Sequence, residues 1–151
     1  EFSATVGGGS KPGEVYIFPG GNPFVGSPTK IQAPSPARND GFGYALAVGD
    51  ANGDGVHDLL VGMPLAKVSN KNNAGQAFLF FGGRNAGFDT ASDFTFQDPS
   101  PSNGAQFGLA MALADVNGDG HADAVISAPA PPTGFIGFQG APGKVLVFLS
   151  Q

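Results

Sequence analysis

Residues 41–64 read GFGYALAVGDANGDGVHDLLVGMP, and residues 106–129 read QFGLAMALADVNGDGHADAVISAP. The two stretches keep one spacing throughout, because Phe42 and Phe107 are 65 positions apart and so are Asp50 and Asp115. A constant offset over a span of this length indicates a duplicated structural unit. The chain is therefore expected to consist of repeats, and its fold is predicted one repeat at a time.

Each repeat is predicted to contain four short β-strands. Large and small apolar residues alternate along the first of these strands, which predicts that it is covered on both faces. The fourth strand mixes polar and apolar residues, as suits the outer edge of a sheet. The strands are expected at residues 42–48, 59–63, 76–81 and 93–97 of the first unit and at residues 107–114, 124–128 and 144–149 of the second.

A partial copy precedes the two full units. Residues 13–18 resemble residues 75–80 and 143–148, which predicts third and fourth strands at residues 14–18 and 29–32. We therefore divide the chain into a partial N-terminal blade (residues 1–40), a first repeat (residues 41–105) and a second repeat without its last strand (residues 106–151).

Stacked units of four antiparallel strands predict an all-β protein made of β-propeller blades. The alternative architecture is a β-sandwich, which would explain the strands but not the duplication at 65 residues.

The composition of the chain limits the functions that it can have. The 151 residues carry a net charge of −5 and include no cysteine. No basic stripe is present, so binding to nucleic acid is not expected. No apolar run approaches the roughly 18 residues of a membrane helix, so no membrane insertion is expected. The absence of cysteine excludes disulfides and thiolate metal sites.

Each repeat also carries a loop with the pattern Asp-x-Asn-x-Asp-Gly-x-x-Asp. Oxygen ligands at alternate positions suit Ca²⁺, and the glycine at position six, Gly55 or Gly120, permits the positive φ that wraps the loop around an ion. We predict two Ca²⁺ ions per chain, one in each loop. The predicted ligands in loop one (residues 50–58) are Asp50, Asn52, Asp54, the carbonyl of Val56, and Asp58; in loop two (residues 115–123) they are Asp115, Asn117, Asp119, the carbonyl of His121, and Asp123.

Two other interpretations account for these loops less well. An EF-hand loop needs Glu at position twelve, where this chain has Val61 and Ile126. A turn without metal would explain the Asn-Gly and Asp-Gly pairs. It would not explain three carboxylates and an asparagine within nine residues, because these carboxylates would repel one another without a cation.

Three motifs together resemble the FG-GAP repeat of integrin α-subunit propellers. They are the Phe-Gly opening (Phe42-Gly43 and Phe107-Gly108), the Asp-rich loop, and a Gly-x-Pro after the second strand. The last reads Gly62-Met63-Pro64 and Ser127-Ala128-Pro129, so Met63 and Ser127 depart from the usual residues. The family typically closes a ring of seven blades. Two and a half blades cannot close one alone, so self-association or a place in a larger propeller is expected.

The resemblance implies a non-catalytic, calcium-binding propeller region that serves extracellular adhesion or ligand recognition. Its partner would be a protein or a glycan, outside the cell or at its surface. The ligand face would be the rim opposite the calcium loops, formed by residues 34–40, 67–74, 98–106 and 130–141.

Two alternative functions stay open at this point. One is a carbohydrate-binding lectin, in which Phe135 and Phe138 would stack on sugar rings. The other is an accessory domain of a secreted enzyme. The chain itself is not expected to be an enzyme, because no nucleophile motif occurs. We expect His57 and His121 to be solvent-facing residues of the metal loops.

Overall fold

The computed structural model describes residues 2–4, 12–18, 20, 26–83, 87–88, 90–129 and 142–151. In this part of the chain every regular element is a β-strand, which confirms the all-β prediction. None of the described residues forms a helix long and apolar enough to cross a membrane. The strands are β1 (Phe2–Ala4), β2 (Val15–Ile17), β3 (Thr29–Ile31), β4 (Leu46–Gly49), β5 (Asp58–Met63), β6 (Gln76–Phe80), β7 (Gly82–Gly83), β8 (Gly87–Phe88), β9 (Phe94–Phe96), β10 (Met111–Ala114), β11 (Asp123–Ala128) and β12 (Lys144–Phe148).

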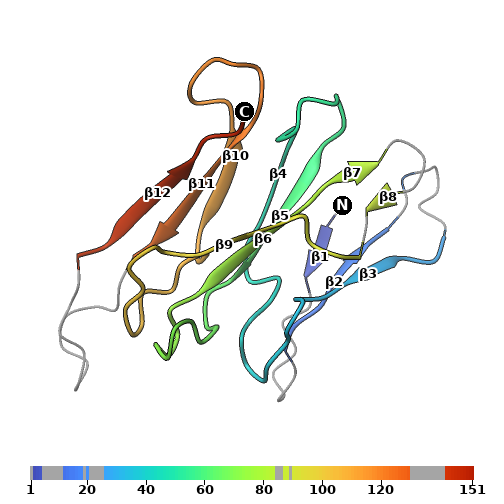
Figure 1. Cartoon of the computed structure of the whole chain (residues 1–151). Coiled ribbons are helices and arrows are strands. Elements are labelled where there is room, and N and C mark those ends of the chain that lie inside the picture. Colours follow the sequence, from blue (N-terminus) through green and yellow to red (C-terminus); the bar gives the residue numbers. More distant parts are fainter. Residues whose placement is uncertain are drawn as a thin grey trace.

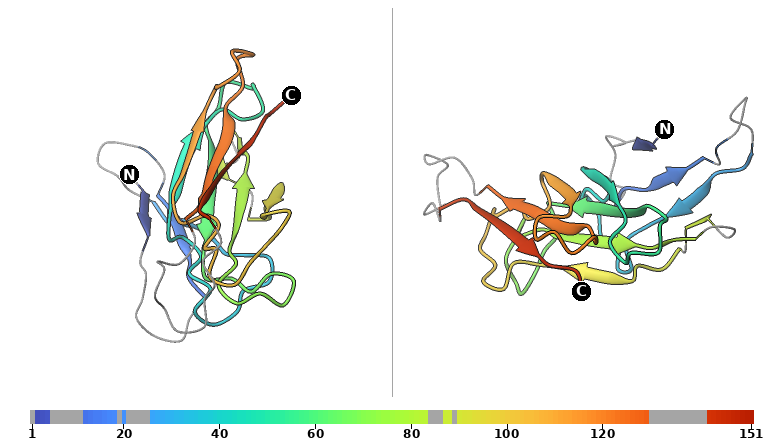
Figure 2. Two further views of the ribbon diagram at one scale, coloured as in Figure 1. Left: turned by 90° about the vertical axis from the view of Figure 1, so that its left-hand side faces the viewer. Right: turned by 90° about the horizontal axis from the view of Figure 1, so that it is seen from above.

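Three antiparallel sheets follow one another along the chain and lie next to one another in space (Figures 1 and 2). The N-terminal sheet has the order β1-β2-β3, blade one has the order β4-β5-β6-β9, and blade two has the order β10-β11-β12. The two blades share one register, because Leu59 pairs with Phe80 in blade one and Ala124 pairs with Phe148 in blade two. β7 and β8 form a separate small pair.

The N-terminal sheet contains one strand more than the sequence suggested. β1 runs antiparallel to β2, with Phe2 opposite Ile17, and so takes the place of a second strand beside the third. The residues of β1 carry no part of the repeated motifs, so the repeats do not predict this strand.

The first strand of each full unit is shorter than predicted. β4 begins at Leu46 and β10 at Met111, because the Phe-Gly pair before each strand forms a turn. In this turn Gly43 and Gly108 both have a φ of 87°, and the N–H of Tyr44 donates to the carbonyl of Gly41 at 3.1 Å. The prediction that the first strand is covered on both faces is also wrong, since 43% of Val48 within β4 is exposed.

The Phe-Gly turns join each sheet to the sheet before it. The N–H of Phe42 donates to the carbonyl of Pro12 at 3.0 Å, and the N–H of Phe107 donates to that of Ala74 at 2.9 Å. Both rings are buried, and the centroid of the Phe42 ring lies 5.9 Å from that of the Phe78 ring. One apolar core therefore fills the space between the N-terminal sheet and blade one, and a second fills the space between blades one and two.

Candidate metal centres

The two predicted metal loops lie next to each other at one edge of the molecule, at the top of Figure 1. Loop one joins β4 to β5, and loop two joins β10 to β11. Each loop therefore connects the first and second strands of its blade, as the repeated sequence predicts.

The first aspartate of each loop accepts hydrogen bonds from the loop backbone. Asp50 Oδ1 accepts from the N–H groups of Gly53 at 2.7 Å and Asp54 at 3.1 Å, and Asp50 Oδ2 accepts from Gly55 at 2.8 Å. Asp115 makes the same three bonds in loop two. The bond from Gly120, followed by that from Gly118, holds the pKa of Asp115 below its usual value.

The backbone conformation of both loops agrees with the role predicted for the glycine at position six. Gly55 has a φ of 79° and Gly120 a φ of 91°, a region that residues with a Cβ rarely adopt. The aspartate before each glycine is exposed and accepts from the N–H two residues later, at 2.7 Å in loop one and 2.9 Å in loop two.

The last aspartate of each loop is fully buried and has a structural role that the sequence did not indicate. Asp58 accepts from the N–H of Ala51 at 2.7 Å and from the N–H of Gly82, beyond β6, at 2.9 Å. Asp123 accepts from Val116 at 3.0 Å and from the N–H of Ser150, beyond β12, at 2.8 Å. Both carboxylates thus fasten the loop to the end of the third strand.

The surroundings of these two carboxylates shift their pKa values in opposite directions. Burial raises the pKa of Asp58, which belongs to the blade that is covered on both faces. The hydrogen bond from the Val116 N–H, the largest influence on Asp123, lowers the pKa of that carboxyl.

The donor groups of the loops fit Ca²⁺ in type and in backbone conformation. The side chains offer only hard oxygen ligands at positions one, three, five and nine, and each carboxylate oxygen that accepts one hydrogen bond keeps a further lone pair. Within the described ranges, however, no three His, Cys, Asp or Glu side chains are gathered closely enough to hold a metal ion. The ligand set and the number of ions therefore stay predictions.

The two histidines of the loops lie in different surroundings. His57 is exposed, as expected. The same expectation is wrong for His121, which is partly buried with its ring against Gly53 of loop one and its Nδ1 enclosed without a hydrogen-bond partner. The sequence could not show this contact because it joins two different repeats.

Loops at the opposite edge are joined by hydrogen bonds. The N–H of Asn72 donates to Asn103 Oδ1 at 2.8 Å, and the N–H of Gln106 donates to the carbonyl of Asn73 at 3.0 Å. Ser69 and Gln106 adopt positive φ values of 48° and 54°, which non-glycine residues rarely do. Residues 130–141, with Phe135 and Phe138, lie outside the described residues.

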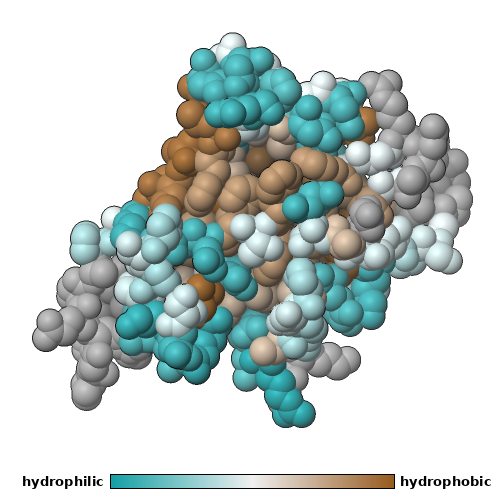
Figure 3. Space-filling view, in the orientation of Figure 1, coloured by the Kyte–Doolittle hydropathy of each residue, from teal (hydrophilic) through white to brown (hydrophobic). Residues whose placement is uncertain are grey.

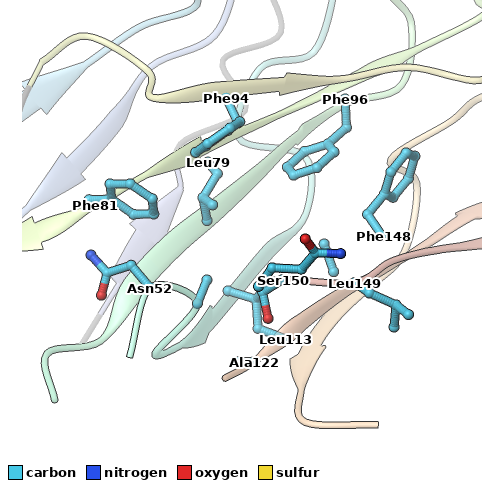
Figure 4. Close-up of a pocket in the computed structure, with 13 residues that line it drawn as sticks. Asn52, Leu79, Phe81, Phe94, Phe96, Leu113, Ala122, Phe148, Leu149 and Ser150 are labelled. Atoms are coloured by element: carbon cyan, nitrogen blue, oxygen red, sulfur yellow. The ribbon is translucent and has the colours of Figure 1, made fainter. Parts of the chain in front are cut away.

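An aromatic cleft of about 350 Å³ opens between the outer strands of the two blades (Figures 3 and 4). Four phenylalanines line it. The ring centroids of Phe96 and Phe148, one from each blade, lie 4.9 Å apart. Asn52, Ser150 and Gln151 supply polar groups at its border. The sequence does not reveal this cleft because its walls come from two repeats. The four rings are those of Phe81, Phe94, Phe96 and Phe148.

Comparison with known proteins places these features in a family. The FG-GAP repeat profile matches residues 42–80 and 107–148, together more than half of the chain. Mouse integrin alpha-IIb is 37% identical over 115 residues, which cover 73% of this chain and 10% of the integrin. Human phosphatidylinositol-glycan-specific phospholipase D is 37% identical over 93 residues, covering 62% of this chain and 11% of that protein.

Mouse integrin alpha-3 is 34% identical over 111 residues, which cover 73% of this chain and 9% of the integrin. This chain thus spans about a tenth of the length of the relatives that it matches. The repeated Phe-Gly turns, the strand order and the profile match agree with one another. The chain therefore belongs to the FG-GAP repeat family, and its sheets are blades of the β-propeller type.

Proposed function

We propose that this chain is a non-catalytic, calcium-stabilised part of an extracellular propeller that recognises a protein or glycan ligand. The observation that carries the calcium part is the duplicated loop. Both copies present the same types of oxygen ligand. In both, the first aspartate accepts hydrogen bonds from three backbone N–H groups at equivalent positions.

The residues that would hold the ions are those of the predicted ligand sets. A bound Ca²⁺ supplies positive charge that offsets the repulsion between the clustered carboxylates. Asp54 and Asp119 are exposed and would contribute to the ion alone, whereas Asp58 and Asp123 would act as ligands in addition to accepting the backbone hydrogen bonds that stabilise the loops. The expected effect is a more stable rim, without any chemical step.

The ligand-binding part of the proposal rests on the opposite rim and on the relatives. Residues 67–74 and 98–106 are held together by hydrogen bonds, with positive φ values at four non-glycine positions. Unfavourable backbone conformations of this kind are often found at functional sites. The integrin relatives support adhesion or ligand recognition outside the cell. The four residues are Ser69, Asn70, Asn73 and Gln106.

A second candidate function is carbohydrate binding or support of an attached enzyme. The aromatic cleft favours a ligand with apolar faces, because sugar rings and apolar side chains both stack on phenylalanine. The phospholipase D relative shows that similar repeats occur within a protein named as an enzyme. A glycan array, with Phe94→Ala as the matched variant, distinguishes a lectin from a protein-binding propeller.

Calorimetric titration of chelator-treated protein with Ca²⁺ tests the calcium part. We expect about two sites with dissociation constants on the order of 10⁻⁴–10⁻³ M, the range of extracellular modules. Asp54→Asn and Asp119→Asn, which remove charge but keep the side-chain shape, should each abolish one site. A stoichiometry near zero in the unmodified chain would refute the proposal.

A further inference from the structure

The two metal loops are in direct contact through their backbones. The N–H of Ala122 in loop two donates to the carbonyl oxygen of Asp50 in loop one at 2.7 Å. Asp50 also provides the first predicted side-chain ligand of loop one, and Ala122 follows the predicted carbonyl ligand His121 of loop two. A single hydrogen bond therefore connects the first residue of loop one to the last-but-one residue of loop two.

A side-chain contact reinforces this hydrogen bond. The His121 ring lies so close to Gly53 that a Cβ added there would sit 2.9 Å from each ring nitrogen. Gly118 holds the equivalent position in loop two, with a φ of 81° against 74° for Gly53, and a Cβ added there would meet nothing within 4 Å. Among the described residues the contact therefore runs from loop two onto loop one, and Gly118 has no equivalent contact.

We propose that His121 is a positioning residue that couples the two loops, so that Ca²⁺ binding in one loop strengthens binding in the other. This inference rests on the proposed calcium function. An ion in loop two would fix the carbonyl of His121. The backbone around His121 would then hold its ring against Gly53 and hold the N–H of Ala122 in its hydrogen bond to the carbonyl of Asp50. Gly53 in turn donates its own N–H to Asp50 Oδ1.

The direction of the effect follows from preorganisation. Loop one loses conformational freedom when it binds an ion, and the contacts from loop two remove part of that freedom in advance. The coupling is reciprocal, because two binding equilibria that influence each other do so by the same factor. Val56 occupies the place of His121 in loop one, so His121→Val gives loop two the side chain that loop one already has.

Two-dimensional NMR titration with Ca²⁺ measures each loop separately through the amide signals of Gly55 and Gly120. Asp119→Ala disables loop two, and we expect it to weaken binding in loop one about fivefold, at the lower end of typical coupling. In the His121→Val background the same change should alter loop one less than about twofold, since the contact of the His121 ring with Gly53 is then absent and only the backbone hydrogen bond from Ala122 to Asp50 still joins the loops.

The two equivalent glycines provide a matched pair of variants. Gly53→Ala displaces the His121 ring, so it should weaken binding in loop two as well as in loop one. Gly118→Ala brings the same backbone strain without a new contact, so it should leave loop one unchanged while loop two is saturated. Melting curves in chelator establish that each variant is folded.

The outcomes separate this inference from the proposed function. If both glycine signals respond to Ca²⁺ but loop one binds equally well with and without Asp119→Ala, the coupling is wrong and the calcium function stands. If neither signal responds at roughly 10 mM Ca²⁺, well above the affinity range of such modules, the calcium function itself is wrong.

Discussion

Lys144 Nζ lies 2.7 Å from Asp98 Oδ2, and this ion pair ties β12 of blade two to the loop after β9 of blade one. Only 3% of the Asp98 side chain is exposed, while 38% of the Lys144 side chain is. The other ion pair within the described residues joins Lys30 to Glu14. There 29% of the Glu14 side chain is exposed, far more than of Asp98. The pair between the blades is therefore the one expected to matter for stability.

Lys144→Met is expected to destabilise the chain by about 1–2 kcal/mol, because it leaves the buried Asp98 carboxylate without its cation. Lys30→Met is the matched control and should cost less than about 1 kcal/mol, since its pair is solvated. Urea unfolding of both variants measures the difference. Equal stability of the two variants would contradict the assignment.

Phe107→Ala is expected to lower the free energy of unfolding by about 3–5 kcal/mol, because the ring fills the core between the two blades. Tyr44→Ala also removes an aromatic ring but should cost far less, since 51% of Tyr44 is exposed. Denaturant midpoints with unchanged slopes give both values. A small effect of Phe107→Ala would show that the blades do not depend on this core.

Asp58→Ala and Asp54→Ala are expected to behave differently when the metal is removed. Asp58→Ala leaves the buried N–H groups of Ala51 and Gly82 unsatisfied and should cost about 2–4 kcal/mol even in chelator. Asp54 is exposed, so Asp54→Ala should matter only with Ca²⁺ present. At ~1 mM Ca²⁺ each site adds roughly 0.4–1.4 kcal/mol by linkage.

The four melting temperatures of these two variants, each measured with Ca²⁺ and with chelator and compared with those of the unmodified chain, test this difference. An equal loss for Asp54→Ala under both conditions would show that Asp54 has a structural role of its own.

The outward face of blade two is expected to drive association of the 151-residue chain. Val145, Val147 and Leu149 are exposed by 65%, 49% and 56%, and apolar groups gathered in this way often mark interaction surfaces. Light scattering at micromolar concentration should show species heavier than the monomer, and Val145→Lys combined with Val147→Lys should reduce them. Phe18→Lys, at the far sheet, is the control. A strict monomer in the unmodified chain would contradict this prediction.

Local residue types were enough to predict much of the fold and of the candidate site. The 65-residue spacing of Phe42 and Phe107 predicted the repeated blades, and the structure places both rings in equivalent cores. The glycine at position six of each loop has the positive φ that the motif requires. Both features can be recognised in the linear sequence, because a duplication is visible as repeated residue types and the conformation of a loop glycine depends on neighbours within a few residues.

Other features depended on contacts between distant residues. Alternating apolar residues predicted a strand from Phe42, yet the turn at Gly43 delays β4 until Leu46, because burial of the Phe42 ring between two sheets overrides the local alternation. The aromatic cleft likewise needed Phe96 and Phe148 to meet from separate repeats.

The sequence by itself determined the repeats, the strand-rich class and the oxygen donors of both loops, since each of these follows from residue type and spacing. Only the tertiary structure decided that Asp58 is fastened to Gly82 and that His121 covers Gly53. The physical reason is that packing brings together surfaces that are far apart in the chain. The two loops have nearly the same sequence, but among the described residues the His121 ring of loop two lies against Gly53, and nothing lies within 4 Å of a Cβ built at Gly118.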